Sequence, residues 1–527
     1  MLINRGADGY SGNNPSTRAG SSLVTQKSLW RIGAACAGGL VCGPAAAHSF
    51  GRLYNLPVPF WLYAYGAAAA LVLSFLIIGF FVSSGTAVTE GASKDLGASA
   101  WVRTLRRWRV MAVLKALSVG CLLLCIATGF FGNANPYLNF NMTFFWIVFV
   151  LGFAYLTAVI GDVYATINPW RVLSDLVARG TKGFGRGRWT YPQRLSYWPA
   201  LALYVAFIWI ELFGFIRPYS LSVLLSVYSA INLLGVWAVG ASAWFRYCEF
   251  FSVFLRLTAK MAPFDYDVQG RTSAAGGRMP GAAVPGTPGR LRWRWPFAGL
   301  MHERAESLSL LVFVLFMLSS TAYDGLRATA PWVRMFWDDP FNLLTPLVGM
   351  RPVMAFVQLR PYYLVYESLW LLLSPFLYLV VYLAFIVLAK RVTRSSLSVR
   401  ELALEFGFSL LPIALVYNIT HYYTLILTQG VKIISLWSDP FGWGWNLFGT
   451  AGKFRAPYLP DMGWVWHSQV GLIVFGHIVS VYIAHRIALR VFATPRKATL
   501  SQLPMLVLMM LFTTAGLWIL SQPIQSG

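Results

Sequence analysis

The chain has 527 residues, of which 57% are hydrophobic and only 12% are charged. Apolar runs of membrane-spanning length recur along it, so the composition is that of a polytopic membrane protein and not of several water-soluble domains. The net charge of +23 does not indicate nucleic-acid binding, because the basic residues flank apolar runs and do not line one polar face. We therefore expect membrane lipids, and no nucleic acid, as partners.

The N-terminal segment 1–47 has the pattern of a signal peptide preceded by a polar extension. Lys27 and Arg31 precede a short apolar run of small residues, and the run ends in an Ala-x-Ala cleavage sequence at Ala47. Cleavage there would make His48 the first residue of the mature protein. An N-terminal histidine offers an amino group and an imidazole to a metal ion such as copper or zinc. The alternative is that His48 only marks where the leader stops.

Hydropathy along the mature chain predicts an all-α fold, a transmembrane bundle of about ten helices. The predicted spans lie near 59–83, 110–131, 142–166, 198–217, 221–243, 305–324, 362–389, 402–428, 463–486 and 499–521.

Basic residues predict the orientation. With the mature N-terminus outside, the inner segments carry 28 Lys and Arg and the outer segments carry nine. Positively charged loops stay in the cytoplasm, so we expect both mature termini on the periplasmic side of a bacterial inner membrane.

One cytoplasmic segment, 244–304, divides five spans in 48–243 from five in 305–527. It is expected to contain an amphipathic interfacial helix near 250–261 and a flexible Gly/Pro-rich linker near 270–290. The two halves show no internal repeat, which disfavours an inverted-repeat transporter.

Ionisable residues within the spans are few, and each needs a partner, a cavity or a place near the interface. On the inner side they are Lys115, Asp162, Glu306 and His485; on the outer side they are Glu211, Asp324, Glu367, His421 and His467, with Asn418, Tyr422 and Gln469 near them in sequence. Snorkelling or pairing near the headgroups explains the inner group.

The ninth span carries His467, His477 and His485, which cannot share one metal ion. At about 1.5 Å rise per residue, the first two are about 15 Å apart along the helix and the last two about 12 Å. Each can therefore serve a different site, a proton path or a core hydrogen bond.

The depth of residues in the membrane, counted along their spans, indicates which donors on the outer side could bind one metal ion. His421 and His467 lie within about 10 Å of the outer ends of their spans, and Asp324 ends its own span. Together with His48, these donors could hold zinc, copper or another divalent metal and leave a position for water. The alternative is that they are hydrogen-bonded intramembrane histidines, since no local motif such as His-x-x-x-His is present.

Several stretches resemble the bacterial membrane proteins described as fenitrothion hydrolases. They are the run from Ala47 through His48 to Tyr63, Glu306–Gly325, Thr420-His421-Tyr-Tyr, Ser438-Asp-Pro, Gly444–Gly449, Gln469, Gly476-His477 and Ala484-His485. The likeness covers most of the mature chain. Arg486 departs from it, because the family pattern has an acidic residue after this histidine, and a role for His485 is in doubt.

The resemblance implies a membrane-bound hydrolase that cleaves the aryl ester P–O bond of lipophilic organophosphorus triesters such as fenitrothion. Metal-assisted activation of water would suit this chemistry, with His421, His467 and Asp324 as the expected ligands and His48 as a further one. His477 would orient a neighbour or relay protons. The alternative is a transporter or a copper- or metal-handling protein without dedicated hydrolytic activity, and either could act with a partner subunit.

Overall fold

The computed structural model describes residues 59–81, 94–96, 99, 102, 109–267, 290–454 and 460–522. The predicted signal peptide, His48 and the linker at 270–289 lie outside these residues.

Helices make up most of the described chain and strands very little of it, as the all-α prediction requires. The longer helices are α2 (Phe60–Phe81), α4 (Val110–Phe131), α8 (Pro169–Gly180), α9 (Trp198–Phe213), α10 (Pro218–Val239), α12 (Phe250–Ala259), α14 (Leu308–Arg327), α17 (Phe356–Thr393), α19 (Leu411–Thr428), α21 (Met462–Val491) and α22 (Pro495–Ser521). Another long helix is continuous from α5 (Phe140–Met142) through the π-helical η1 (Thr143–Phe153) to α6 (Ala154–Ile160).

Shorter elements connect them. The short α-helices are α7 (Tyr164–Ile167), α11 (Ala241–Tyr247), α13 (Ala298–His302), α15 (Ala330–Trp337), α16 (Thr345–Val348), α18 (Val399–Phe406) and α20 (Ile433–Ser438). The 3₁₀ turns are η2 (Phe184–Arg186), η3 (Gln193–Leu195), η4 (Pro352–Ala355), η5 (Gly407–Leu410) and η6 (Gly430–Lys432), and the strands are β1 (Lys94–Asp95), β2 (Phe264–Asp267) and β3 (Arg290–Trp293).

Within the described residues, nine helices are long and apolar enough to cross a membrane. The one remaining predicted span, the fourth at 198–217, corresponds to α9, which is apolar but has only 16 residues. It ends early because Gly214 is followed by Phe215 at a positive φ of 44°, and Pro218 then begins α10. The chain is therefore a multi-pass helical membrane protein, with a shorter fourth helix than the hydropathy suggested.

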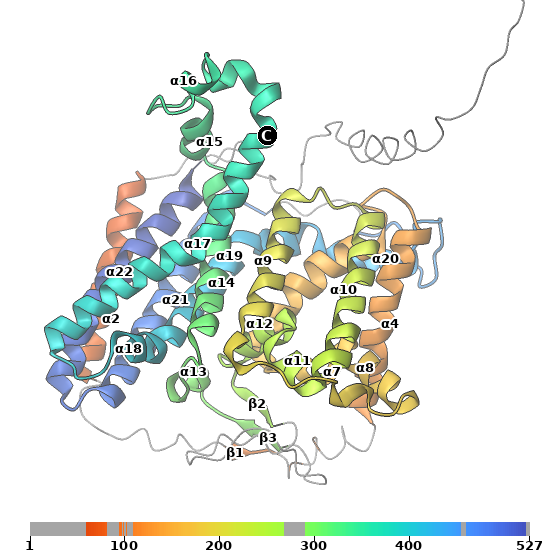
Figure 1. Ribbon diagram of the computed structural model, residues 1–527, viewed down its shortest axis with the longest axis horizontal. Helices are drawn as coiled ribbons and strands as arrows, with labels where there is room; N and C mark the ends of the chain where they lie inside the picture. Colours follow the sequence, from red (N-terminus) through yellow and green to blue (C-terminus); the bar gives the residue numbers. More distant parts are fainter. Residues whose placement is uncertain are drawn as a thin grey trace, which may run out of the picture. The chain divides into compact units, whose positions relative to one another are not determined.

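The centre of the bundle is α14, which packs against α9, α17, α19 and α22 (Figure 1). Its apolar stretch is 83% buried, more than that of any other candidate span in the described residues; the span 399–428, which ends in α19, follows with 72%. α14 is the least apolar of the candidate spans in the described residues, and its buried polar side chains, such as Ser320, Thr321 and Asp324, find partners inside the bundle that lipid could not supply.

The first long helix, α2, packs against the last two. It contacts α21 and α22, and α22 in turn contacts α17 (Figure 1). On the other side of the bundle, α4 and α10 lie against each other. The segment 48–243 therefore does not pack as a separate unit, because its first helix belongs with the helices of 305–527.

The helix predicted near 250–261 is α12, and its surroundings differ from those expected of an interfacial helix. Seven of its residues are buried, among them Phe250, Phe251 and Leu257, and it contacts α6, α7, α9, α11 and α19. The phenylalanines and leucines cover most of its circumference, so α12 is enclosed by the bundle.

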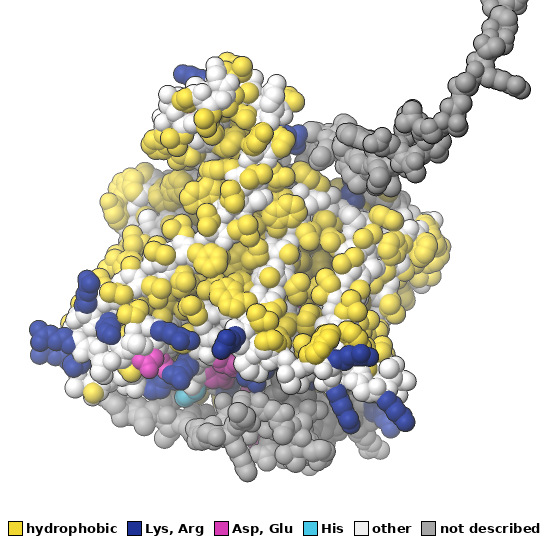
Figure 2. Space-filling view, in the orientation of Figure 1, with side chains coloured by type: hydrophobic (Ala, Val, Ile, Leu, Met, Phe, Trp, Pro, Cys, Tyr) yellow, Lys and Arg dark blue, Asp and Glu magenta, His cyan; other side chains and the backbone are white. Residues whose placement is uncertain are grey.

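Basic residues gather at one end of the bundle, which we call the basic end. Figure 2 shows Lys and Arg along this edge, below a broad hydrophobic band. A small antiparallel sheet of order β1-β3-β2 lies there, with Lys94 and Phe264 both opposite Trp293, and Arg490 pairs with Glu405 at 2.6 Å. At the opposite end, which we call the aromatic end, lie α15 and α16 (Figure 1).

Candidate functional site

A cluster of charged side chains lies inside the bundle near the C-terminal end of α14. Asp324 and Arg327 come from α14, Glu367 from α17, and His421 and Tyr422 from α19. Asp324 and Arg327 are three residues apart, so both project from one face of α14.

The Asp324 carboxylate is the centre of this cluster, and its residue is only 5% exposed. One oxygen, Oδ2, lies 2.9 Å from His421 Nε2 and accepts a hydrogen bond of 2.8 Å from the Tyr422 hydroxyl. The other, Oδ1, accepts from Arg327 Nε at 3.2 Å. A buried carboxylate needs such partners, because desolvation of an unpaired charge costs several kcal/mol.

Arg327 also links this carboxylate to a second one. Its guanidinium lies 3.7 Å from Glu367 Oε1, and the Glu367 backbone carbonyl accepts a hydrogen bond from Tyr323. One arginine therefore stands between two carboxylates.

Gly325 allows the helices to approach closely at this point. A Cβ at residue 325 would lie 2.6 Å from Ile519 Cγ2 of α22 and 3.6 Å from His421 Cε1. The first distance is too short for any real contact. Because Gly325 has no side chain, this turn of α14 can pack closely against α22 and also lie next to His421.

A small cavity borders Asp324 and is lined by residues of η1, α9, α12, α14 and α19. It has a volume of about 40 Å³, and its polar lining comes from Glu211, Ser320, Thr321, Asp324, Asn418 and Tyr422. The rest of the lining is mostly phenylalanine and leucine. A polar cavity of this size has room for about two or three water molecules, so the Asp324 carboxyl has space for hydration.

Asn418 fixes the wall of this cavity across two helices. The Tyr155 hydroxyl donates to the Asn418 side chain and carbonyl, both at 3.0 Å, and so joins α6 to α19. Gln469 donates to the Thr420 carbonyl at 2.8 Å and joins α21 to α19. These contacts hold α19 in the rotation that points His421 and Tyr422 at Asp324.

A second buried carboxylate, Glu249, differs from Asp324 in its surroundings. It accepts from the backbone N–H groups of Phe251 and Ser252, from the Tyr228 hydroxyl at 2.5 Å and from Asn168 at 3.1 Å. Both carboxylate oxygens of Glu249 already accept hydrogen bonds, from the first turn of α12 and from neighbouring side chains. Glu249 is therefore a helix cap in the core.

The sequence-predicted residues Asp324 and His421 are in direct contact, whereas His467 lies elsewhere. His467 is exposed on α21, where Nδ1 bonds to the Gly463 carbonyl at 2.7 Å and Nε2 lies 3.4 Å from the Tyr63 hydroxyl of α2. His467 thus belongs to the contact between α2 and α21.

The two deeper histidines of α21 are fully buried. His477 donates through Nδ1 to the Ile473 carbonyl at 2.8 Å, and its ring packs edge-on against Tyr417, one helical turn from His421. Within the described part of the chain, neither ring nitrogen of His485 has a hydrogen-bond partner. Toward the basic end, Glu306 pairs with Arg246 at 3.2 Å.

The donors in the described ranges do not complete the predicted metal site. No group of three or more His, Cys, Asp or Glu side chains able to hold a metal ion occurs among these residues. Catalytic zinc takes three protein ligands, and Asp324 and His421 supply two. His48, the remaining predicted donor, lies outside the described residues.

Arg327 and Gly325 are the site residues that sequence reasoning missed. The spacing of Arg327 three residues after Asp324 was a usable signal, because it predicts an ion pair on one helix face. The contact of Gly325 with α22 left no such signal, since it depends on how distant helices pack.

The fold and this cluster define the class: a multi-pass helical membrane protein with an Asp–His–Arg–Glu cluster buried in its core. No protein-family model, curated protein or solved structure matches the chain, so comparison with known proteins assigns it to no family.

Proposed function

We propose that the protein is an integral-membrane hydrolase of the bacterial inner membrane that cleaves the aryl ester P–O bond of lipophilic phosphotriesters. The observation that carries the proposal is the 2.9 Å contact between Asp324 and His421 in the core of a membrane bundle. A carboxylate that holds an imidazole in this way is the arrangement with which hydrolases activate a nucleophile. The resemblance to fenitrothion hydrolases supplies the substrate class.

His421 would act as the general base. Its Nε2 faces Asp324, so Nδ1 is the nitrogen that would take a proton from water as the water oxygen bonds to phosphorus. The P–O bond to the aryl group then breaks with its electron pair on the aryl oxide, which takes the proton back from His421. Asp324 would orient the imidazole and stabilise its charged form.

Two substitutions test this role. We expect His421→Gln to lower the turnover of an aryl phosphotriester by about 10²- to 10⁴-fold, because that is the usual contribution of a general base. Tyr422→Phe should have a small effect, since it removes one hydrogen bond to Asp324 and keeps the pair. Release of the aryl oxide by the full chain in lipid nanodiscs measures the rate.

His467→Gln is the matched control. His467 is expected on the same side of the membrane as His421, but it contacts Gly463 and Tyr63 and not Asp324. Turnover by this variant should therefore stay at the wild-type rate. Equal loss in both histidine variants would favour the predicted metal site that includes His467. No turnover by the wild type above protein-free nanodiscs would overturn the proposed activity.

The predicted divalent metal, zinc or copper, stays a prediction with its own test. Because Asp324 and His421 supply two donors, a metal site would need His48 or another donor from outside the described residues. If the pair acts alone, treatment with a chelator should leave turnover unchanged. Loss of activity that added zinc or copper restores would instead establish a metal site.

Transport is the second candidate, and a different observation supports it. Two carboxyl groups, Glu211 and Asp324, line one internal cavity that also contains Asn418 and Tyr422. Intramembrane carboxyls around a cavity are typical of proton relays. A pH change inside proteoliposomes, produced by the wild type and lost in Glu211→Gln, would favour a proton-coupled transporter.

A further inference from the structure

The segment that joins α8 to α9 at the basic end carries several cations and no carboxylate. The cations are all exposed, and they are Arg179, Lys182, Arg186, Arg188 and Arg194. Neither Asp nor Glu occurs from residue 176 to residue 210. Figure 2 shows Lys and Arg side chains of this end just below the hydrophobic band. Basic residues at the edge of such a band lie at the depth of lipid headgroups.

Part of this segment is fixed to the C-terminal end of α10. Arg188 donates its backbone N–H to the Ala238 carbonyl at 2.8 Å, and Trp189 donates to the same carbonyl at 2.9 Å. The last carbonyls of a helix have no partner within the helix, so these bonds satisfy an acceptor that α10 would otherwise leave open. Gly187 makes the contact possible, because a Cβ there would lie 2.4 Å from the Gly240 nitrogen. Arg188 and Trp189 are therefore held at one place on the surface.

The Arg188 side chain lies over a tryptophan ring of α10. Its guanidinium carbon is 4.8 Å from the ring centroid of Trp237. Trp189 packs edge-on against the same ring, with centroids 5.8 Å apart and planes inclined at 86°. Both tryptophans are exposed, Trp189 by 63% and Trp237 by 37%. The ring restricts the guanidinium of Arg188, and the N–H donors at its edge can still bond to a phosphate.

From Trp237 toward its N-terminus, α10 presents an exposed apolar stripe, which we call the α10 stripe. Its members recur three or four residues apart and so lie on one face of the helix; they are Val223, Val227, Ala230, Leu234 and Trp237. At about 1.5 Å rise per residue, the stripe is about 21 Å long. One leaflet of the hydrocarbon core is about 15 Å thick, so the stripe is long enough for an acyl chain whose headgroup lies beside Arg188.

We propose that Arg188, Trp189 and the α10 stripe form a binding site for one anionic phospholipid. The phosphate accepts hydrogen bonds from the Arg188 guanidinium, and an acyl chain lies along the α10 stripe. A net negative headgroup is favoured because the segment from 176 to 197 offers cations to it and no carboxylate to the ammonium group of a zwitterionic lipid. The proposal concerns binding alone and does not depend on hydrolysis.

Phosphatidylglycerol and phosphatidylcholine with the same acyl chains form a matched pair of probes, because only the first has a net charge. Native mass spectrometry of the full chain in detergent, titrated with each lipid, measures the affinity of the first bound molecule. We expect phosphatidylglycerol to bind at least about fivefold more tightly, since one Lys or Arg near an anionic headgroup contributes about 1 kcal/mol. Equal binding of the two lipids would overturn the proposal.

Two arginine variants locate the effect. Arg188→Gln removes one charge from an exposed side chain, so it should weaken phosphatidylglycerol about fivefold and leave phosphatidylcholine unchanged. Arg400→Gln is the matched control, because Arg400 is exposed at the same end but belongs to α18, which packs against α17 and α14. This variant should keep the wild-type preference. Equal losses in the two variants would show attraction to the whole basic end and would contradict a site at Arg188.

Two further measurements test the acyl chain. Glycerol 3-phosphate carries an anionic phosphate without acyl chains, so an excess of it should not displace phosphatidylglycerol; displacement would show that the headgroup alone binds and would contradict the role of the α10 stripe. A phosphatidylglycerol with a photoactivatable diazirine on its acyl chain, added at one equivalent, should label residues 223–237, and less so in Arg188→Gln. Labelling that is confined to other segments would place the lipid elsewhere and overturn the assignment.

Discussion

At the scale of single residues, Gly325 determines how closely three helices meet beside the charged cluster. A Cβ there would lie 2.6 Å from Ile519 Cγ2, and His421 Cε1 lies 3.6 Å away on the other side. Packed interiors have little room to adjust, so added volume at this point moves a helix or strains a side chain.

We expect Gly325→Ala to destabilise the protein by about 1–3 kcal/mol, the usual cost of overpacking a core. Thermal unfolding in detergent, followed by circular dichroism, measures the change. Gly471→Ala is the control, because a Cβ there would meet no described atom within 4 Å and alanine favours a helix.

Truncating Ile519 should restore part of the stability that Gly325→Ala loses. Ile519→Ala deletes the methyl group that the new Cβ would strike, so adding it to Gly325→Ala should cost less than the two single changes together. Full additivity of the two losses would show that the strain lies elsewhere.

Sequence reasoning found Asp324 and His421 because depth can be counted along a helix from the end of a hydrophobic span. It could not place His467 relative to them. Rotation about a helix axis decides which neighbour a side chain meets, and for α21 that rotation depends on its contacts with α2 and α19. Those contacts are set by packing between distant segments, which one sequence does not reveal.

At the scale of elements, the turn after α15 depends on one carboxylate. Desolvation alone would raise the pKa of Asp339, but hydrogen bonds from Thr345, Leu343 and Leu344 outweigh it, so the pKa lies below its ordinary value. Asp339 itself has a positive φ of 47°. The turn is therefore maintained by these hydrogen bonds against an unfavourable backbone conformation.

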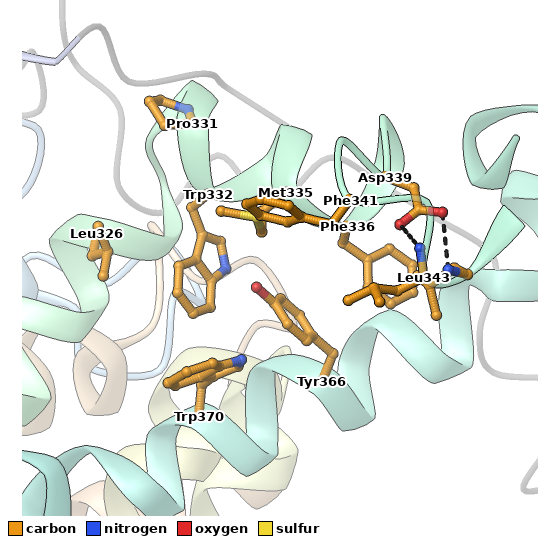
Figure 3. Close-up of a pocket in the computed structure, with 11 residues that line it drawn as sticks. Leu326, Pro331, Trp332, Met335, Phe336, Asp339, Phe341, Leu343, Tyr366 and Trp370 are labelled. Atoms are coloured by element: carbon orange, nitrogen blue, oxygen red, sulfur yellow. Dashed lines mark hydrogen bonds between the residues drawn. The ribbon is translucent and has the colours of Figure 1, made fainter.

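We expect Asp339→Ala to release this turn. Hydrogen exchange should become faster at the amides of residues 343–345, which lose their hydrogen bonds to this carboxylate (Figure 3). Asp338→Ala is the control, because Asp338 is exposed and makes a long surface pair with Arg334 at 3.9 Å. Unchanged exchange in Asp339→Ala would contradict the role of this carboxylate.

The pH dependence follows from the same bonds. A carboxyl whose folded pKa is depressed stabilises the folded turn above its unfolded pKa, near the ordinary value of 3.8, and loses that contribution as pH falls through the folded pKa. The turn should therefore be intact at neutral pH and weaken only in strong acid.

Element boundaries were predictable where apolar runs end in charged residues, and less so elsewhere. Nothing in the hydropathy of 198–217 indicated a break, and α9 ends because of the local conformation at Gly214 and Phe215. For α12, an apolar segment that carries Arg256 and Lys260 suggested an amphipathic helix at the membrane surface. Its aromatic side chains instead fill the space between α9, α10 and η1, where they pack in tilted and edge-on orientations against Phe207, Tyr228 and Phe149.

At the scale of the whole molecule, the unequal distribution of Lys and Arg predicts the orientation. The basic end should face the cytoplasm and the aromatic end the periplasm. Reporter fusions inserted in 270–290 should give cytoplasmic signals, and fusions in 429–462 periplasmic ones. Reversed signals would also relocate the Asp324 cluster, which lies toward the aromatic end.

The contact of α2 with α21 and α22 has a consequence for how the protein is made. A chain emerges from the ribosome with its N-terminal part first, so α2 enters the membrane long before its partners exist. Until residues 462–521 are synthesised, the face of α2 that holds Ala67 and Leu71 has no permanent neighbour. The bundle can close only when translation is nearly complete, and until then α2 stands in lipid, which its apolar surface tolerates.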